Sequence, residues 1–434
     1  MISRLPSLVE ASREIRGGQL SPRQLVSSCL QNMERLEHDL RAWVLVDAEG
    51  ALAEADRLEE LAAQGRWLGP LHGIPLGVKD IIDVAGWPTR AGSPVREDHR
   101  AIEDAAVVRR LRQAGAIVLG KTVTTQFACF DPSETRNPCD PTRTPGGSSS
   151  GSAAAVRAEM CLAALGSQTG GSIVRPAAYC GICGLKPTYA AVDMTGVVPV
   201  SGRLDHVGPL ARRVADLALV MDAIAVTRPT GFGEVGAADS AANSVAAPPV
   251  LRPVVPYFWE RADPEVRSCV QAVMDRYGER PLELPVGFEQ VHLHHRRIMA
   301  YEAAQYHAAT FRLQSDRYAP HIHSLIEEGL AIDSATFQES CAHQTAMRGA
   351  IERWLPAGQI GVTPATPSVA PRSLLTTGDP SFNSPWSYTG VPTVTFPIGE
   401  VDGMPCGIQL IGRHHADVEL LEAARWLEAE LAAV

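Results

Sequence analysis

Amphipathic helices alternate with short apolar strands along the first part of the chain. Apolar residues recur at helical spacing in "SPRQLVSSCLQNMERLE", "AEGALAEADRLEELAAQG" and "EDAAVVRRLRQAG", which predicts three helices. Ser21 and Pro22 supply a cap and a first-turn residue for the first of them. The apolar runs "AWVLVD", "GIPLGVKDIIDV" and "AIVLG" predict strands between the helices. This alternation predicts an α/β protein in which helices cover a sheet.

The rest of the chain continues with longer helices. "AAAVRAEMCLAALGS" predicts a helix followed by a strand, and "RVADLALVMDAIAV" predicts a buried helix. Residues 227–250 are small, polar and rich in proline, so we expect a surface excursion or linker there. Mostly helical sequence then runs from "EAAQYHAATF" to "MRGAIERWL". Strands are predicted at "QIGVTPATP" and "PTVTFPIG", and "DVELLEAARWLEAELAAV" predicts a closing helix.

The composition is that of a globular protein with a large core. The chain has 434 residues, of which 45% are hydrophobic and 20% charged. At about 150 residues per domain this length allows three domains, and one large α/β domain fits as well. The formal net charge of −10 argues against a nucleic-acid partner.

No segment predicts insertion into a membrane. The longest apolar stretch, "VADLALVMDAIAV", is about 13 residues long and contains Asp216 and Asp222, so it is too short and too charged to span a bilayer. The N-terminal "MISRLPSLVEASREIRGG" lacks the apolar core of a signal peptide. The nine widely spaced cysteines are typical of reduced thiols. We therefore expect a cytoplasmic protein.

Two matches to well-known glycine motifs lie in the wrong context. "GAIVLGKT", at residues 115–122, fits the phosphate-binding loop, but that loop needs a strand before its first glycine and a helix after it. Here a helix precedes the motif and the apolar residues within it are themselves a strand, so we expect Lys121 to be structural. "GSSSG", centred on Ser149, fits a nucleophile elbow, yet the proline-rich "NPCDPTRTP" before it is not a central strand.

Clusters of cysteine and histidine do not predict a metal site. "CGIC", at residues 180–183, has no second ligand pair nearby, so we expect two buried small side chains. "HLHH" at residues 292–295, "HIH" at residues 321–323 and the pair His414 and His415 have no Cys, Asp or Glu at ligand spacing. We expect these histidines to be solvated.

Lys79 is the only charged residue in the apolar stretch that begins at Gly73. A lysine on a buried strand is desolvated, which favours the neutral amine and makes it a possible base for a serine. The sequence alone equally allows a structural ion pair with Asp80 or Asp83.

The glycine- and serine-rich centre of the chain resembles the amidase signature family. The stretch "PGGSSSGSAAAV…LGSQTGGSIVRPAAYCGICGLKPT" carries the resemblance, together with "PLHGIPLGVKDIIDVAG" and "RRLRQAGAIVLGKT". "DPSFNSPWSYTGVPTVTFPIG" and "MPCGIQLIGRHHADVELLEAARWLE" extend it to the C-terminal end. The resemblance is weakest across residues 227–350, which we expect to be the most divergent part, facing the substrate or the surface. It implies one α/β domain over residues 1–434, with a large twisted mixed sheet covered by helices on both faces.

The resemblance also implies a Ser–Ser–Lys catalytic set. Ser172 of "TGGS" corresponds to the nucleophile, Ser148 of "GGSSS" to the bridging serine and Lys79 of "GVKD" to the base. The implied oxyanion hole consists of the backbone N–H groups of Thr169, Gly170, Gly171 and Ser172. In the family the bridging serine follows a cis peptide bond, which here would join Gly147 and Ser148.

This chain departs from the family pattern beside the nucleophile. The family often has Asp where this chain has Gln168, and Arg where it has Val174; here the arginine is Arg175, one position further on. An Asp–Arg brace is therefore either absent or replaced by a contact between Gln168 and Arg175.

We expect a hydrolase that cleaves a linear carboxamide, or a related carbamate or urea bond, without a cofactor. A first alternative is an amidotransferase subunit that frees ammonia from glutamine for a tRNA-charging complex, although residues 290–350 contain no obvious group to recognise the glutamine α-carboxylate. A second is a nucleotide-binding protein built on "GAIVLGKT". A homodimer is compatible with the sequence. The segments that hold Phe127, Phe130, Trp386 and Tyr388 suggest an apolar or aromatic acyl pocket.

Overall fold

One mixed sheet of eleven strands organises the computed structural model, which describes residues 5–226 and 248–433. The strand order is β1-β3-β2-β4-β6-β5-β10-β11-β9-β7-β8. The strands are β1 Trp43–Val46, β2 Pro75–Lys79, β3 Ile117–Thr122, β4 Ala163–Gln168, β5 Cys183–Lys186, β6 His206–Ala211, β7 Val250–Val255, β8 Leu282–Glu283, β9 Gln359–Pro364, β10 Thr393–Val401 and β11 Met404–Ile411. β2 pairs in parallel with β3 and β4, whereas the pairs from β4 through β9 are antiparallel.

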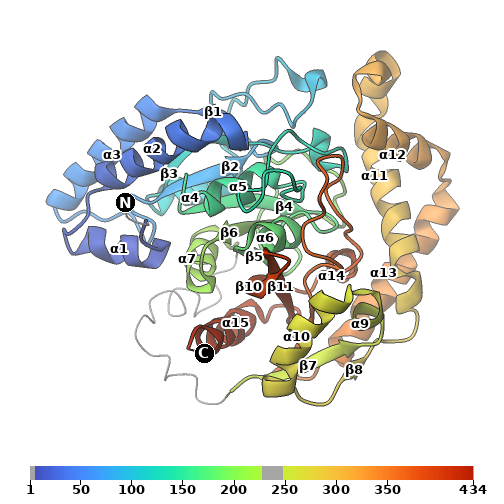
Figure 1. Ribbon diagram of the computed structural model, residues 1–434. Helices are drawn as coiled ribbons and strands as arrows, with labels where there is room; N and C mark the ends of the chain where they lie inside the picture. Colours follow the sequence, from blue (N-terminus) through green and yellow to red (C-terminus); the bar gives the residue numbers. More distant parts are fainter. Residues whose placement is uncertain (1–4, 227–247, 434) are drawn as a thin grey trace.

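Helices flank the sheet (Figure 1). They are α1 Leu8–Arg16, α2 Pro22–Leu40, α3 Ala48–Ala63, α4 Ala106–Gln113, α5 Ser150–Arg157, α6 Val174–Cys180, α7 Val214–Ile224, α9 Tyr257–Arg261, α10 Pro264–Tyr277, α11 Val291–Gln314, α12 Pro320–Ala331, α13 Ser334–Trp354, α14 Ser384–Thr389 and α15 Asp417–Ala432. Single 3₁₀ turns occupy Pro94–Arg96, Gln126–Ala128, Phe288–Gln290 and Ser315–Arg317.

The start of α2 follows from its sequence. Ser21 caps the helix by accepting a hydrogen bond from the Gln24 backbone, and the Gln24 side chain accepts one from the Ser21 backbone in return. Pro22 occupies the first helical position, where no N–H is needed. The predicted Ser21–Pro22 helix start is therefore confirmed.

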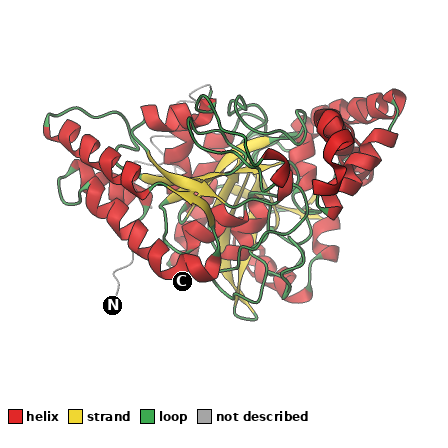
Figure 2. Cartoon of the chain, turned by 90° about the horizontal axis from the view of Figure 1, so that it is seen from above, coloured by secondary structure: helices red, strands yellow, loops and turns green. Residues whose placement is uncertain are grey.

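Apolar cores lie on both faces of the sheet. Along β3, Ile117 and Leu119 belong to a core formed with α2, α3 and α5, whereas Val118 belongs to the larger core shared with α4 and α7. Side chains alternate between the two faces of a strand, so a strand that is apolar throughout must be covered twice. Figure 2 shows the strands running through the centre with helices on either side. The predicted α/β class, with a mixed sheet and helices on both faces, is confirmed.

Helices α12 and α13 both pack against the long helix α11 at one side of the sheet (Figure 1, gold to orange). The helical content predicted for this part of the chain is confirmed. The linker predicted at residues 227–250 lies mostly outside the described residues, and Val250 already begins β7. None of the helices within residues 5–226 and 248–433 is long and apolar enough to cross a membrane.

Candidate active site

Lys79 ends β2 and is completely buried. Its Nζ lies 2.7 Å from Ser148 Oγ, 3.0 Å from Ser149 Oγ and 2.8 Å from Ser167 Oγ. Burial lowers the pKa of Lys79 well below its usual value, and the nearby Asp205 carboxylate opposes this effect only in part. A lysine surrounded by hydroxyl groups and desolvated in this way is suited to act as a neutral amine.

Asp80 is not the partner of Lys79. Its carboxylate forms an ion pair with Lys121 at 2.9 Å, and both side chains are buried. Lys121 Nζ also donates to the Pro88 carbonyl and to Thr89 Oγ1. Among the described residues no carboxylate lies within ion-pair distance of Lys79. The ion-pair interpretation of Lys79 is therefore not supported.

The same contacts explain the phosphate-loop match. Residues 117–122 form β3, as predicted, and Lys121 points to a carboxylate and two protein oxygens. A lysine engaged in this way is not available for phosphate. Ser149 of the second match follows a loop and precedes α5, so it lies in no strand-to-helix elbow.

Ser148 is held in the loop that leads into α5. The Gly147–Ser148 peptide bond is cis, as the resemblance implies. The carbonyl oxygen of Gly147 accepts a hydrogen bond from Arg175 Nη2 at 2.7 Å. Ser149 Oγ in turn accepts a hydrogen bond from the Ser167 backbone at 3.2 Å, which joins the loop to the end of β4. These contacts place Ser148 beside Lys79.

The segment from Thr169 to Ser172 connects β4 to α6. Within the described part of the chain, the backbone N–H groups of Gly170, Gly171 and Ser172 donate no hydrogen bond. A Cβ on Gly171 would lie 2.6 Å from Asn383 Oδ1, so only glycine fits this close approach. Three consecutive N–H groups without a protein acceptor can stabilise a negatively charged oxygen.

Gln168 and Arg175 support this segment separately. Gln168 Oε1 accepts hydrogen bonds from the backbones of Ile173 and Val174, at 2.9 and 3.0 Å. Arg175 instead donates to Gly147, to Thr377 Oγ1 and to the Gly378 carbonyl. A direct Gln168–Arg175 contact, which the sequence left open, is thus not formed. Two independent supports replace it.

Thr169 is fixed from two sides. Its Oγ1 donates to Asp205 Oδ1 at 2.5 Å, and its carbonyl oxygen accepts a hydrogen bond from His295 Nε2 at 2.9 Å. Burial raises the pKa of Asp205 to about 6, against the hydrogen bonds from Thr169, Ser201 and Val200. Burial lowers the pKa of His295 to about 4, so its ring is neutral near pH 7. Thr169 is the first residue of the segment, so these contacts orient the N–H groups that follow.

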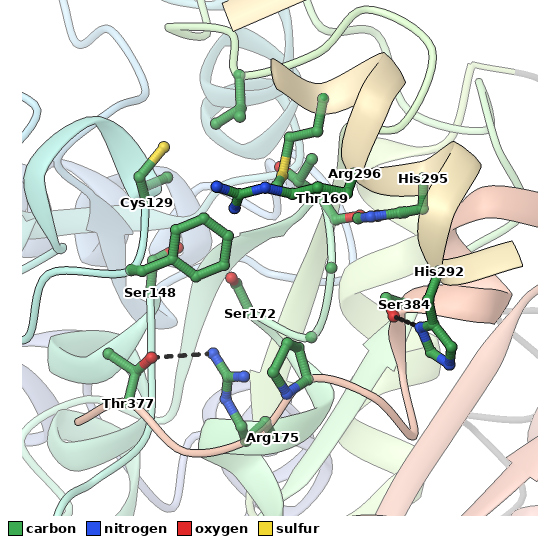
Figure 3. A pocket seen from close by; sticks show the side chains of 17 residues that line it. Cys129, Ser148, Thr169, Ser172, Arg175, His292, His295, Arg296, Thr377 and Ser384 are labelled. Atoms are coloured by element: carbon green, nitrogen blue, oxygen red, sulfur yellow. Dashed lines mark hydrogen bonds between the residues drawn. The ribbon is translucent and has the colours of Figure 1, made fainter. Parts of the chain in front are cut away.

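The two serines that the resemblance implies as catalytic lie at a cavity of about 240 Å³ (Figure 3). Ser148 and Ser172 both line it, together with the whole of the segment from Thr169 to Ser172. Of the 17 described residues that line it, none is Asp or Glu, and two are arginines, Arg175 and Arg296. The cavity is smaller than the usual range for drug-sized ligands.

Only one of the four aromatic residues suggested for the pocket lines this cavity. Phe130 does so, beneath the guanidinium of Arg296. Phe127 is buried elsewhere, against His307 and Tyr318. The other two belong to α14, whose side chains are buried in the core: the Trp386 ring stacks on Phe258 and Trp354, and the Tyr388 hydroxyl contacts His343 Nδ1. Apolar sequence near a site does not distinguish a pocket wall from the core behind it.

The histidines of "HLHH" are not solvated, which corrects the expectation from the sequence. His294 and His295 are buried, and His292 and His295 line the cavity. His292, His295, Arg296 and Met299 of α11 all face it. Their spacing of three, four and seven residues is that of one helix face, so the α11 periodicity contained a signal that could have found them.

The two cysteines of "CGIC" are buried between a helix and a strand. Cys180 and Cys183 are buried free thiols at the end of α6 and the start of β5. Burial raises the pKa of both thiols well above the ordinary value. In the described ranges no group of three or more His, Cys, Asp or Glu residues could hold a metal ion.

Comparisons with known proteins agree with this geometry. The profile of the family described as Amidase matches residues 24–421. A glutamyl-tRNA(Gln) amidotransferase chain of Moorella thermoacetica is 33% identical over 96% of this chain and 94% of its own, and an amidase of Pseudomonas putida is 35% identical over 91% and 89%. One solved structure superposes on this chain with a TM-score of 0.91 at 30% sequence identity, and the match covers 98% of each chain. It is described as an unexpected vestigial protein complex that reveals the evolutionary origins of an s-triazine catabolic enzyme. The chain therefore belongs to the amidase signature family of hydrolases acting on C–N bonds.

Proposed function

We propose that this chain hydrolyses a linear carboxamide, or a related carbamate or urea bond, through an acyl-serine intermediate. Ser172 is the nucleophile, Ser148 relays its proton and Lys79 is the base. The observation that carries this proposal is a fully buried lysine, 2.7 Å from the hydroxyl of a serine that lines the same cavity as Ser172 and with no carboxylate partner among the residues that the structure describes.

Activation begins with proton transfer. Ser172 Oγ attacks the substrate carbonyl carbon while its proton passes to Ser148 Oγ, and the Ser148 proton passes to the neutral amine of Lys79. A hydroxyl both donates and accepts, so Ser148 can relay without changing its own charge. Burial lowers the pKa of Lys79, which favours the neutral amine that this step requires.

The carbonyl oxygen becomes negatively charged in the tetrahedral intermediate. The free N–H groups of Gly170, Gly171 and Ser172 supply donors to it, and the hydrogen bonds of Thr169 to Asp205 and His295 hold these donors in place before the reaction. Removing one such donor in other enzymes typically lowers the rate by about 10²–10³-fold.

Collapse of the intermediate breaks the C–N bond. The Lys79 ammonium returns its proton through Ser148 to the leaving nitrogen, because an amine leaves only when protonated. Water then enters, gives its proton to Lys79 by the same route and attacks the acyl carbon. The ester bond then breaks, and the Lys79 ammonium returns its proton through Ser148 to Ser172 Oγ, which restores the serine and releases the acid.

A serine-directed reagent and a substrate panel test this proposal together. A fluorophosphonate should label Ser172 in the wild type, and labelling should be lost in Ser172→Ala. The panel should contain aryl, alkyl and ureido amides and carbamates, and release of amine or ammonia should depend on Ser172. Turnover that persists in folded Ser172→Ala would refute the acyl-serine mechanism.

A second candidate, one component of a glutamine-dependent amidotransferase, is supported by the similarity to the Moorella protein. Arg296 lies within residues 290–350 and lines the cavity, but its pairing with Glu328 leaves it a less suitable recogniser of the glutamine α-carboxylate. Ammonia release from glutamine that depends on co-purified partner chains would favour this candidate. Hydrolysis of simple amides by the isolated chain, without activity on glutamine, would favour the amidase.

A further inference from the structure

Arg175 is a buried cation that has no counter-ion within residues 5–226 and 248–433. Its exposed fraction is 3%, and it lines the cavity that contains Ser172. Among the described residues no carboxylate lies within ion-pair distance of its guanidinium; its partners are the two carbonyl oxygens of Gly147 and Gly378 and the Thr377 hydroxyl. Asp379 acts on it only from beyond that distance. The positive charge of Arg175 is thus not neutralised by a direct ion pair in the part of the chain that the structure describes.

The hydrogen-bonding capacity of Arg175 is also incompletely used. A guanidinium has five N–H donors, and the three contacts above occupy three of them. The Nε of Arg175 is buried and has no hydrogen-bond partner within the described ranges. A buried charge is unfavourable unless it is paired and fully hydrogen-bonded. The site is therefore complete only when an anion joins it.

The remaining groups around the cavity do not provide that anion. None of the 17 lining residues is Asp or Glu. Arg296, the other cation, is already paired with Glu328 at 2.7 Å. His292 and His295 are held towards the neutral form, because burial lowers the pKa of both. Figure 3 shows Ser172 between the guanidinium groups of Arg175 and Arg296. Arg175 is thus the unpaired charge beside the nucleophile.

We infer that the substrate of this site is a small amide that carries a carboxylate, and that Arg175 binds this carboxylate. This inference rests on the amidase function proposed above and adds the chemical class of the substrate. Arginine binds carboxylates through paired, charge-assisted hydrogen bonds, which gives orientation as well as affinity. With a cavity of about 240 Å³, half-amides of short dicarboxylic acids are suitable compounds.

Arg175 also supports Ser148 through its hydrogen bond to Gly147, so a loss of activity in an Arg175 variant would not by itself identify a substrate contact. The informative quantity is the ratio of kcat/KM for two amides that differ only in charge. Succinamate and butanamide form such a pair, because a methyl group replaces the carboxylate. A purely supporting role lowers both values equally, whereas loss of a carboxylate contact lowers only the value for succinamate.

The wild type should prefer succinamate by at least about 100-fold, because a site built for a polar group rejects the analogue that lacks it. Arg175→Met should bring the ratio close to one, and Arg175→Lys should keep part of the preference. Arg372→Gln, in which an exposed arginine is changed, is the control and should keep the full ratio. If Arg175→Met does not fold, Arg175→Lys and Arg175→Gln take its place in the comparison.

Two results would overturn the inference directly: a wild type that does not prefer succinamate, or an unchanged ratio in Arg175→Met. Loss of the preference for succinamate in Arg296→Gln but not in Arg175→Met would also overturn it.

A binding measurement separates this inference from the catalytic proposal. Calorimetry with succinate and the Ser172→Ala protein requires no turnover. Binding that disappears in Ser172→Ala/Arg175→Met and persists in Ser172→Ala/Arg372→Gln supports the inference even if no amide is hydrolysed, a result that would refute only the amidase function. Hydrolysis of neutral amides without binding of succinate would refute the inference and leave the amidase function standing.

Discussion

Arg175 Nη2 donates a 2.7 Å hydrogen bond to the carbonyl oxygen of Gly147, 28 positions earlier in the chain. The bond connects the helix that follows the proposed nucleophile to the peptide group that precedes the proposed relay serine. Gln168 caps the start of α6 independently. The Arg175 bond, together with the backbone hydrogen bond from Ser149 to the Ser172 carbonyl, fixes the two serine-bearing segments relative to each other. The arginine shifted by one position from the family pattern thus has a defined structural partner.

Replacement of Ser172 tests the nucleophile. Ser172→Ala should abolish turnover and leave the thermal unfolding midpoint nearly unchanged, since the substitution removes one hydroxyl and creates no clash. Mass spectrometry after treatment with a fluorophosphonate should locate the label on Ser172. Ser150→Ala is a matched control, because Ser150 Oγ contacts Ser133 Oγ rather than Lys79. A label on Ser149 or Ser150 would assign the nucleophile elsewhere.

Replacement of Lys79 tests the base. Lys79→Met keeps the length and apolar stem of the side chain but removes the amine, so the protein should fold and lose about 10²–10⁴-fold in kcat/KM or more. Lys79→Arg should be similarly inactive, because a guanidinium stays protonated. Near-wild-type turnover of Lys79→Arg would make Lys79 a structural cation.

The pH profile of the wild type follows from the same group. Burial lowers the pKa of Lys79 well below its usual value, and the base must be neutral in the free enzyme. As pH falls below that lowered pKa, Lys79 becomes protonated, so kcat/KM should fall by about tenfold per pH unit. A kcat/KM that stays constant towards acidic pH, measured where the protein remains folded, would contradict a lysine base.

Asp205 should influence the pH at which kcat/KM falls, that is, the acidic limb of the pH profile. Its carboxylate raises the pKa of Lys79, so Asp205→Asn should move the limb to lower pH. The maximal rate should also fall, because the Thr169 hydroxyl loses a charged acceptor and the oxyanion segment is held less firmly. Asp131→Asn is the control: Asp131 is also buried and accepts backbone hydrogen bonds, but at the start of α12. An unshifted limb in Asp205→Asn would show that Asp205 only supports Thr169.

The extent to which the sequence anticipated this site depended on the type of signal. The order of helices and strands around β2, β3 and β4 could be predicted, because continuous apolar strands and capped helices are local properties. Short glycine-containing strands such as β5 and β6 were not predicted, because their pairing partners lie far away in the sequence. The apolar stretch around Lys79 already made it a possible base, whereas the positions of Ser148 and Ser172 came from the resemblance, since no spacing rule brings Lys79 to Ser148.

Side-chain partners were the least predictable part. The contact of His295 with Thr169 joins residues 126 positions apart. The helical spacing around "HLHH" could place His295 on one face of a helix, but it does not identify Thr169 as its partner. The aromatic residues of α14 face the core because the helix is buried on all sides, which local hydrophobicity does not reveal. A contact between Arg175 and Gln168 was one of two open possibilities, yet each found a backbone partner instead, because backbone groups at helix ends and turns compete for side-chain hydrogen bonds.

Disruption of the buried ion pair between Lys121 and Asp80 should lower the free energy of unfolding of the protein, and it should not affect nucleotide binding, because none is expected. Lys121→Met leaves the Asp80 carboxylate buried without its partner, which typically costs about 3–5 kcal/mol of unfolding free energy. The double variant Lys121→Met/Asp80→Asn removes the unpaired charge and should recover part of that loss. Arg57→Met, which breaks an exposed pair with Glu54, is the control and should cost no more than about 1 kcal/mol. Denaturant unfolding measures these differences, and calorimetry of the wild type with ATP and magnesium should show no heat of binding. No binding is expected because the ion pair with Asp80 leaves no free Lys121 ammonium for a phosphate. A micromolar binding signal for ATP that disappears in Lys121→Met would restore the phosphate-loop interpretation.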